Sequence, residues 1–119
     1  MRRHRIVVAL AAVAAGVVFT AGAVVAASAE KGKAAFMKYG CWQCHGTVGQ
    51  GSPITSQGKV LAPDPTPYET FTAFVRSTNR AMPPYSEAVL PNEDLADIYA
   101  YLRSIPKPAD YKSIPLLNQ

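Results

Sequence analysis

The sequence predicts a small all-α domain of three to four short helices, and three observations favour this fold class. Apolar residues recur at helical spacing in three separate stretches, residues 30–39, 68–77 and 91–104. Val and Ile are scarce beyond the N-terminal region and no alternating pattern persists, so a sheet is not expected. The chain has 119 residues, which leaves room for one small domain behind an N-terminal leader.

The predicted leader occupies residues 1–29. Three arginines precede an uncharged apolar run over residues 6–27, and Ala27-Ser28-Ala29 has the small-x-small form of a signal-peptidase site. The run also has the length of about 20 residues that spans a bilayer, so a cleaved signal peptide and an uncleaved apolar anchor helix both stay open. Positive charge before the run predicts that residues 30–119 lie in the periplasm, at the outer face of the cytoplasmic membrane.

The positive charge of the chain belongs to this leader. The formal net charge is +4, but after Ala29 there are 9 Lys and Arg residues against 8 Asp and Glu residues. Because no basic stripe remains in the body, nucleic acid is not expected as a partner. Strong electrostatic steering of a protein partner is not expected either.

The first predicted helix, residues 30–39, presents Gly32 and Phe36 on one face and ends at Gly40.

The second predicted helix, residues 68–77, has an apolar face made by Phe71, Phe74 and Val75. The third has acidic residues in its first turn and ends before Pro106, since a residue that precedes proline resists helical angles. Its apolar stripe follows the spacing i, i+3, i+4, i+7 and consists of Leu95, Ile98, Tyr99 and Leu102.

Between the first and second predicted helices lies a long irregular loop, residues 46–67, with four glycines and four prolines. A loop of this length in a compact domain is expected to wrap a bound group or to carry a function. The domain is also small enough that its own hydrophobic core gives only marginal stability. The sequence therefore predicts that something supplements the core.

The pentapeptide Cys41-Trp42-Gln43-Cys44-His45 contains both cysteines of the chain and one of its two histidines. This Cys-x-x-Cys-His pattern is the attachment signal for c-type haem. Two thiols on one helical turn can form thioether bonds along one edge of the porphyrin, and His45 then lies under the iron as the proximal ligand. One covalently attached haem c is predicted, which would complete the undersized core.

Two other interpretations use the same residues. A Cys-x-x-Cys pair outside the cytoplasm also suits a thioredoxin-like dithiol or a structural disulfide, but the βαβ pattern of such oxidoreductases is absent from the sequence. A zinc site needs further ligands, and the second histidine is His4 in the leader.

The second axial ligand is predicted to be Met82, in the segment Met82-Pro83-Pro84-Tyr85 between the second and third helices. The prolines stiffen this loop and so reduce the entropy lost when the thioether is held at the iron. Met37 is expected to pack in the core instead, and Met82 as a mere filler of the core is the alternative. A thioether raises the potential and fills the last coordination position, which suits electron transfer.

Residues 30–106 resemble the class I cytochromes c, in particular the small bacterial proteins with a single haem. The resemblance rests on Gly32 and Phe36 with five short segments: Cys41-Trp42-Gln43-Cys44-His45, Gly46, Gly49-Gln50-Gly51, Met82-Pro83-Pro84-Tyr85, and residues 95–102. It implies a class I cytochrome c fold in which the first and last helices cross, with Gly32 and Phe36 against Ile98, Tyr101 and Leu102.

The same resemblance implies roles for the loop residues around position 60. The family has Gly-Pro-x-Leu where this chain has Gly58-Lys59-Val60-Leu61, and a backbone carbonyl there accepts the Nδ1 proton of the proximal histidine. Lysine in place of proline removes rigidity but keeps a carbonyl. Leu61 is expected to line the haem pocket.

Further residues have two open interpretations each. Arg76 and Arg80 are candidates for pairing with the haem propionates, because an arginine fork matches a carboxylate, or they are solvated at the helix end. Trp42 is either an exposed aromatic without a role or part of the surface at the haem edge. The proline-containing tail, residues 107–119, packs on the body or on a partner subunit.

The function predicted from these residues is the transfer of single electrons between redox proteins, a donor and an acceptor, without conversion of a substrate. One alternative is the cytochrome subunit of a periplasmic or membrane-bound dehydrogenase complex, with membrane contact if the leader is retained. A haem enzyme or gas sensor with an open distal position is the other, and it requires Met82 to be off the iron.

Overall fold

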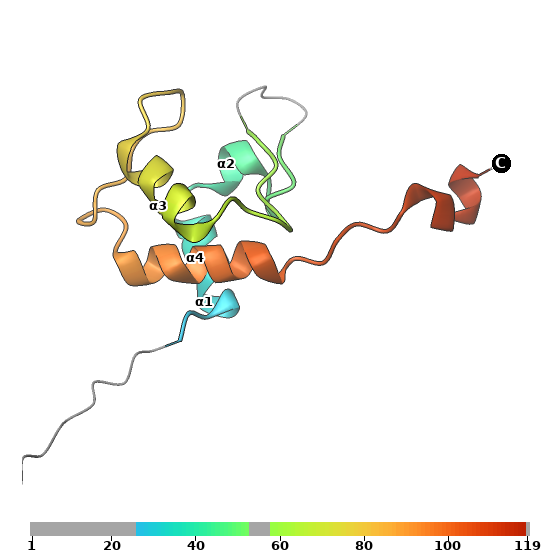
Figure 1. The fold of residues 1–119 in the computed structure, drawn as a ribbon, viewed down its shortest axis with the longest axis horizontal. Helices are drawn as coiled ribbons and strands as arrows, with labels where there is room; N and C mark the ends of the chain where they lie inside the picture. The colour runs from blue at the N-terminus through green and yellow to red at the C-terminus, as the bar shows by residue number, and fades with distance from the viewer. Residues whose placement is uncertain (1–25, 53–57, 119) are drawn as a thin grey trace, which may run out of the picture.

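The computed structural model describes residues 26–52 and 58–118, and within these ranges the chain is helical and has no β-strand. The described residues form four α-helices: α1 (Ala29–Lys38), α2 (Trp42–His45), α3 (Tyr68–Ser77) and α4 (Asn92–Ser104). In Figure 1, α1 crosses α4, while α2 and α3 lie on the same side of α4. The predicted all-α class is confirmed, and each predicted helix lies within one residue of its expected ends.

The predicted leader lies outside the described residues as far as residue 25. Among the residues that the structure does describe, none of the helices combines the length and the apolar character needed to cross a bilayer. The signal peptide and the anchor therefore both stay predictions.

Helix α1 begins at Ala29 because Ser28 caps it. The Ser28 side chain accepts a hydrogen bond from the backbone N–H of Lys31 at 3.3 Å, and Glu30 places negative charge in the first turn. The helix ends where Gly40 takes a positive φ of 76°, a backbone conformation that glycine adopts at little cost.

The crossing of α1 and α4 depends on Gly32. A Cβ atom at this position would lie 1.8 Å from the backbone oxygen of Asp97 and 2.9 Å from Cβ of Tyr101, so only glycine permits this approach. One turn later the rings of Phe36 and Tyr101 pack with centroids 5.7 Å apart. The crossing that the resemblance implied is therefore present.

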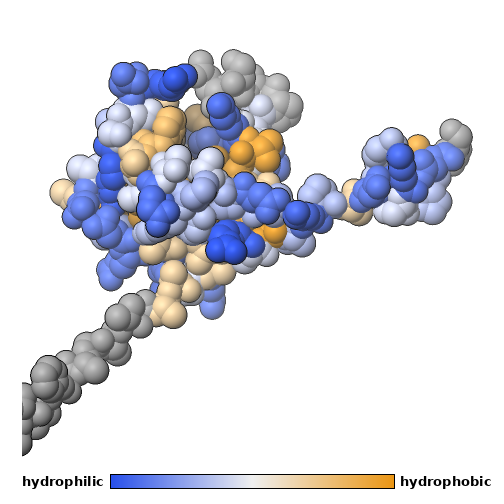
Figure 2. Space-filling view, viewed as in Figure 1, coloured by the Kyte–Doolittle hydropathy of each residue, from blue (hydrophilic) through white to orange (hydrophobic). Residues whose placement is uncertain are grey.

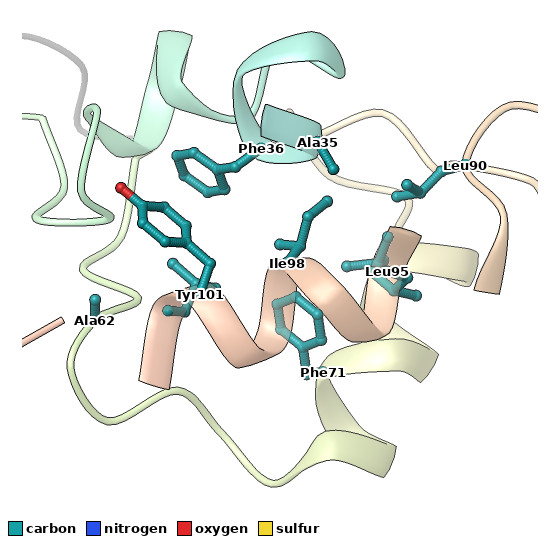
Figure 3. Packing of buried hydrophobic residues seen from close by; sticks show 10 residues of the cluster. Ala35, Phe36, Ala62, Phe71, Leu90, Leu95, Ile98 and Tyr101 are labelled. Carbon is teal, nitrogen blue, oxygen red and sulfur yellow. The ribbon is translucent and has the colours of Figure 1, made fainter. Parts of the chain in front are cut away.

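The hydrophobic core lies between α1, α3 and α4 (Figure 3). Its most deeply buried side chains are all less than 2% exposed, and they are Phe36, Leu90, Leu95, Ile98 and Leu102. Helix α3 adds Phe71 and Val75. Each of these residues removes a large apolar side chain from water, which is the main stabilising contribution to a domain of this size.

Two predicted core positions differ from the structure. Phe74 is 46% exposed, because α3 contacts the core only along the i, i+4 pair of Phe71 and Val75. Tyr99 is only partly buried, and its ring packs beside α3, 5.1 Å from the ring of Tyr68 and 5.3 Å from that of Phe71. Tyr101, rather than Tyr99, occupies the core side of α4.

The described parts of the long loop fold back on each other. The backbone N–H groups of Leu61 and Ala62 both donate to the carbonyl of Gly49, at 2.7 and 3.1 Å. Gly49 is buried with a φ of 69°, and an added Cβ would lie 2.8 Å from Cδ2 of Leu102. The loop is thus attached to α4 at a position where only glycine fits.

The C-terminal tail extends away from the body (Figures 1 and 2). It contains two short 3₁₀ helices, η1 (Tyr111–Ser113) and η2 (Pro115–Leu117), and its apolar side chains Leu116 and Leu117 are exposed. An ion pair between Lys107 and Asp64 at 3.3 Å joins its first residue to the body, but both side chains are exposed, so its contribution to stability is small.

We expect Gly32→Ala to lower the free energy of unfolding by about 2 kcal/mol or more, because the added methyl group forces α1 away from α4. Chemical denaturation of the holoprotein measures this. Lys33→Ala, at the exposed neighbouring position, is the control and is expected to change stability by less than about 0.5 kcal/mol. Equal stability of the two variants would contradict the role given to Gly32.

Candidate functional site

Helix α2 is a single turn that contains Cys44 and His45, and Cys41 precedes it. Cys41 occupies the N-cap position with helical angles, and the N–H of His45 donates to the carbonyl of Cys41 at 3.0 Å. Gly46, with a φ of 75°, ends the turn. Cys41 and Cys44 are both unpaired, so the i, i+3 spacing on one turn leaves two thiols available for bonds to a group outside the chain.

The environment of Cys41 is apolar. Its side chain packs against the hydrophobic core, and burial raises the pKa of the thiol to about 11. Reactive cysteines of disulfide oxidoreductases have a lowered pKa, because the thiolate is the nucleophile. This environment and the absence of a strand in the described residues both disfavour the thioredoxin-like alternative.

The ring of His45 is oriented by a backbone carbonyl. Its Nδ1 lies 2.8 Å from the carbonyl oxygen of Lys59, and a carbonyl oxygen can only accept, so Nδ1 carries the hydrogen. The lone pair of the neutral imidazole is then on Nε2, the nitrogen that binds a metal. Such a hydrogen bond fixes both the tautomer and the orientation of a ligating histidine.

The acceptor lies in the segment where the resemblance placed it, although lysine stands where the family has proline. Gly58 keeps the carbonyl of Lys59 within reach of His45 even without the proline, because it lets the loop pack closely on α2. A Cβ atom at position 58 would lie 1.6 Å from the carbonyl oxygen of Cys44. The backbone of the loop therefore lies directly on α2. The hydrogen bond from the N–H of Gly51 to the carbonyl of His45, at 2.8 Å, holds the loop from the other side.

Leu61 and Met82, both predicted site residues, are partly buried and pack against the hydrophobic core together with Cys41. Met82 lies in the irregular segment between α3 and α4. Met37 differs from its prediction, because its side chain is 38% exposed on α1 and is not part of the core.

Tyr85 belongs to the Met82 segment that carries the resemblance, but the sequence did not predict its role. Its N–H donates to the carbonyl of Val75 at 2.9 Å, and its hydroxyl donates to the carbonyl of Tyr39 at 2.9 Å. Burial raises the pKa of Tyr85, and the nearby Cys41 and Cys44 raise it further. Tyr85 therefore ties the Met82 segment to α3 and to the end of α1, close to the cysteines.

The two arginines differ in their surroundings. The structure gives Arg76 partners other than the predicted propionate, since its Nη1 donates to the carbonyls of Tyr85 and Leu90 and its Nη2 donates to Oδ1 of Asn92. The Arg80 side chain is exposed. Of the two candidates for a haem propionate, Arg80 is thus the more exposed residue. Trp42 is 40% exposed.

The donor set of these residues fits a covalently attached haem. Two unpaired thiols lie on one turn, an imidazole is held with Nε2 available, and a thioether and a leucine lie at the edge of the core. The zinc alternative finds no support here, because in the ranges 26–52 and 58–118 no three His, Cys, Asp or Glu side chains are grouped closely enough to hold a metal ion.

The comparisons with known proteins agree with this donor set. The family model described as cytochrome C oxidase, cbb3-type, subunit III matches residues 27–102, nearly two thirds of the chain. No curated protein and no solved structure matches the chain significantly. The matched range contains α1 to α3 and all but the last two residues of α4, together with Cys41, His45 and Met82.

We expect Gly58→Ala to displace the loop from α2 and so weaken the hydrogen bond from His45 to Lys59. The imidazole Nδ1 proton of His45 would then exchange faster with solvent in NMR spectra of the holoprotein, and the unfolding free energy would fall by about 2 kcal/mol. Lys59→Ala is the matched control, because the acceptor is the backbone carbonyl and the side chain is exposed. Loss of the Nδ1 protection in the control would show that this contact is not set by the backbone.

Proposed function

Since the chain belongs to this cytochrome c family, it is a c-type cytochrome with a role in electron transfer, and we propose that it carries single electrons outside the cytoplasm through one haem with His and Met ligands. Cys41 and Cys44 would hold the haem covalently. His45 and Met82 would be the axial ligands. When bound, the haem supplies an iron that changes between the ferric and ferrous states.

The observation that carries this proposal is the hydrogen bond from His45 Nδ1 to the carbonyl of Lys59. It selects the tautomer whose Nε2 can bind iron and holds the ring where α2 places the two thiols. Because the acceptor belongs to a loop that is packed on α2 through Gly58, the ring has little freedom to rotate. A ligand that is held in place before iron binds loses little entropy in binding.

Ligation by Met82 is supported by its location and by the residues that hold its segment. Like Cys41 and Leu61, the Met82 side chain is partly buried and packs against the hydrophobic core. Pro83 and Pro84 restrict the backbone that follows, and Tyr85 fixes the end of the segment by two hydrogen bonds. Because the protein holds both side chains in place, His45 and Met82 would move little when the charge of a bound iron changes, which favours electron transfer over the binding of small ligands.

The location in the periplasm and the partners belong to the proposal as well. The basic and apolar leader supports export, and covalent attachment prevents loss of the haem outside the cytoplasm. The body after Ala29 has a charge near +1, and hydrophilic and hydrophobic residues are interspersed on the face seen in Figure 2. A redox protein would therefore dock with little dependence on salt.

A second candidate is a cytochrome subunit that passes electrons within a larger membrane complex, such as a dehydrogenase. The exposed apolar tail favours it, because Leu116 is 79% exposed and Leu117 62% exposed on a segment that stands away from the body. The description of the matched family names an oxidase subunit. Purification from membranes in mild detergent distinguishes the two candidates, since a subunit would co-purify with its partners at fixed stoichiometry.

We expect Met82→Ala to abolish the weak red absorption band of ferric iron bound to a thioether, and to let the ferrous protein bind carbon monoxide. The reduction potential should fall by on the order of 0.1 V, because thioether ligation favours ferrous iron. Met37→Ala is the matched control and should keep the band, since Met37 lies on the exposed side of α1. A wild-type protein that lacks the band and binds carbon monoxide readily would instead indicate the open distal site of a haem enzyme or gas sensor.

A further inference from the structure

The segment between α3 and α4, residues 78–91, contains Met82 and has neither helix nor strand. Within it only Thr78 and Leu90, which lie at or near its two ends, are buried, at 7% and 1% exposed. The position of Met82 therefore depends on how the two ends of its loop are held rather than on secondary structure.

A single side chain holds both halves of this segment. Nη1 of Arg76 donates to the carbonyl of Tyr85 at 2.9 Å and to the carbonyl of Leu90 at 2.8 Å, and Nη2 donates to Oδ1 of Asn92 at 2.7 Å. The N–H of Tyr85 donates in turn to the carbonyl of Val75 at 2.9 Å. Residues 75 and 76 are thus paired with residue 85, and the loop that carries Met82 is closed at its base.

We propose that Arg76 is a positioning residue for Met82: its guanidinium closes the loop and so keeps the thioether near the iron. The proposal rests on the proposed ligation by Met82. Closing a flexible loop lowers the number of conformations in which the sulfur is far from its partner, which raises the fraction of time that it is bound. Charge-assisted hydrogen bonds to two carbonyls are among the stronger contacts available for this purpose.

The geometry requires arginine. Three acceptors at two different nitrogens need a planar fork with several donors, whereas the single ammonium group of lysine cannot reach all three positions. Nε of Arg76 is buried and has no hydrogen-bond partner in the described part of the chain, so Nη1 and Nη2 make all the polar contacts of the guanidinium seen there. Helix α3 itself is anchored by Phe71 and Val75, which are buried independently of these contacts.

The test compares Arg76→Gln and Arg76→Lys with the wild-type holoprotein by titrating imidazole against the ferric thioether band. We expect each variant to retain its covalent haem and to lose the band at an imidazole concentration roughly tenfold lower than the wild type, because the loop opens more readily. Arg103→Gln, a charge-matched change at an exposed position of α4, should titrate as the wild type does.

The outcomes separate this proposal from the proposed function. A wild-type band with unchanged imidazole titrations in folded Arg76 variants would overturn the positioning role alone. A wild type without the band would overturn ligation by Met82, and the positioning role with it. If Arg76→Gln does not fold, Arg76→Lys and Asn92→Ala test the positioning role instead. Asn92→Ala removes only the contact to Nη2, so the imidazole concentration at which the band is lost should fall by a smaller factor than in the Arg76 variants.

An independent observation concerns Ser28, which lies inside the predicted signal-peptidase site. Its N–H donates to Oδ1 of Asp97 at 2.6 Å, its carbonyl accepts from the N–H of Gly32 at 2.8 Å, and its hydroxyl accepts from the N–H of Lys31. All three polar groups of Ser28 are therefore used, and one of them joins the start of α1 to α4 at the crossing.

From these contacts we infer that every mature form of the protein retains Ser28, so that removal of the leader, where it occurs, cuts on the N-terminal side of Ser28 and not after Ala29. A cut after Ala29 would remove the N-cap of α1 and the donor to Asp97. A cut after Ala27, also a small residue, would make the donor a charged α-amino group and strengthen its contact with the carboxylate.

The intact mass and N-terminal sequence of the protein, expressed as the full chain and purified after export, test this inference. An N-terminus at Ser28 or at an earlier residue, including an uncleaved chain, is expected. A mature N-terminus at Ala29, at Glu30 or at any later residue would overturn the inference.

Discussion

The candidate site depends on one contact, the hydrogen bond between the ring of His45 and the carbonyl of Lys59. It joins the turn that carries the cysteines to the loop segment that contains Gly58 and Lys59, and it leaves Nε2 as the ring nitrogen with a free lone pair. A side chain at position 58 would collide with the carbonyl of Cys44. The chemistry of the histidine is thus set by backbone packing, which is why lysine can replace the family's proline next to Gly58.

Contacts from α1 and α4 hold the loop that makes this hydrogen bond. Gly32 lets α1 and α4 cross closely, Phe36 packs on Tyr101, and the hydroxyl of Tyr101 donates to the carbonyl of Thr47 at 2.9 Å. Burial raises the pKa of Tyr101, so the hydroxyl stays protonated and keeps this bond. The loop beside α2 is therefore connected to the core through a buried tyrosine, and the core positions the site.

The helices and the haem-attachment turn could be predicted, because each depends on local spacing: i, i+3, i+4 periodicity or a five-residue motif. The crossing at Gly32 was implied only by the resemblance to the class I cytochromes c. The role of Arg76 could not, since two of its three partners are backbone carbonyls that leave no mark in the sequence. Phe74 and Met37 were expected in the core but are exposed. Apolar periodicity predicts which residues share a helix face, but not which part of that face another element covers. Tyr85 acts through its own backbone and the carbonyl of Tyr39, so its part also emerges only in three dimensions.

The central claim is that one haem is bonded to the turn formed by Cys41 and Cys44. The most direct measurement is the mass of the denatured protein after expression in cells that mature c-type cytochromes, combined with the spectrum of its pyridine complex. We expect a chain that is heavier than the bare polypeptide by one haem, which stays attached under denaturing conditions. A colourless protein with the mass of the bare polypeptide would contradict it.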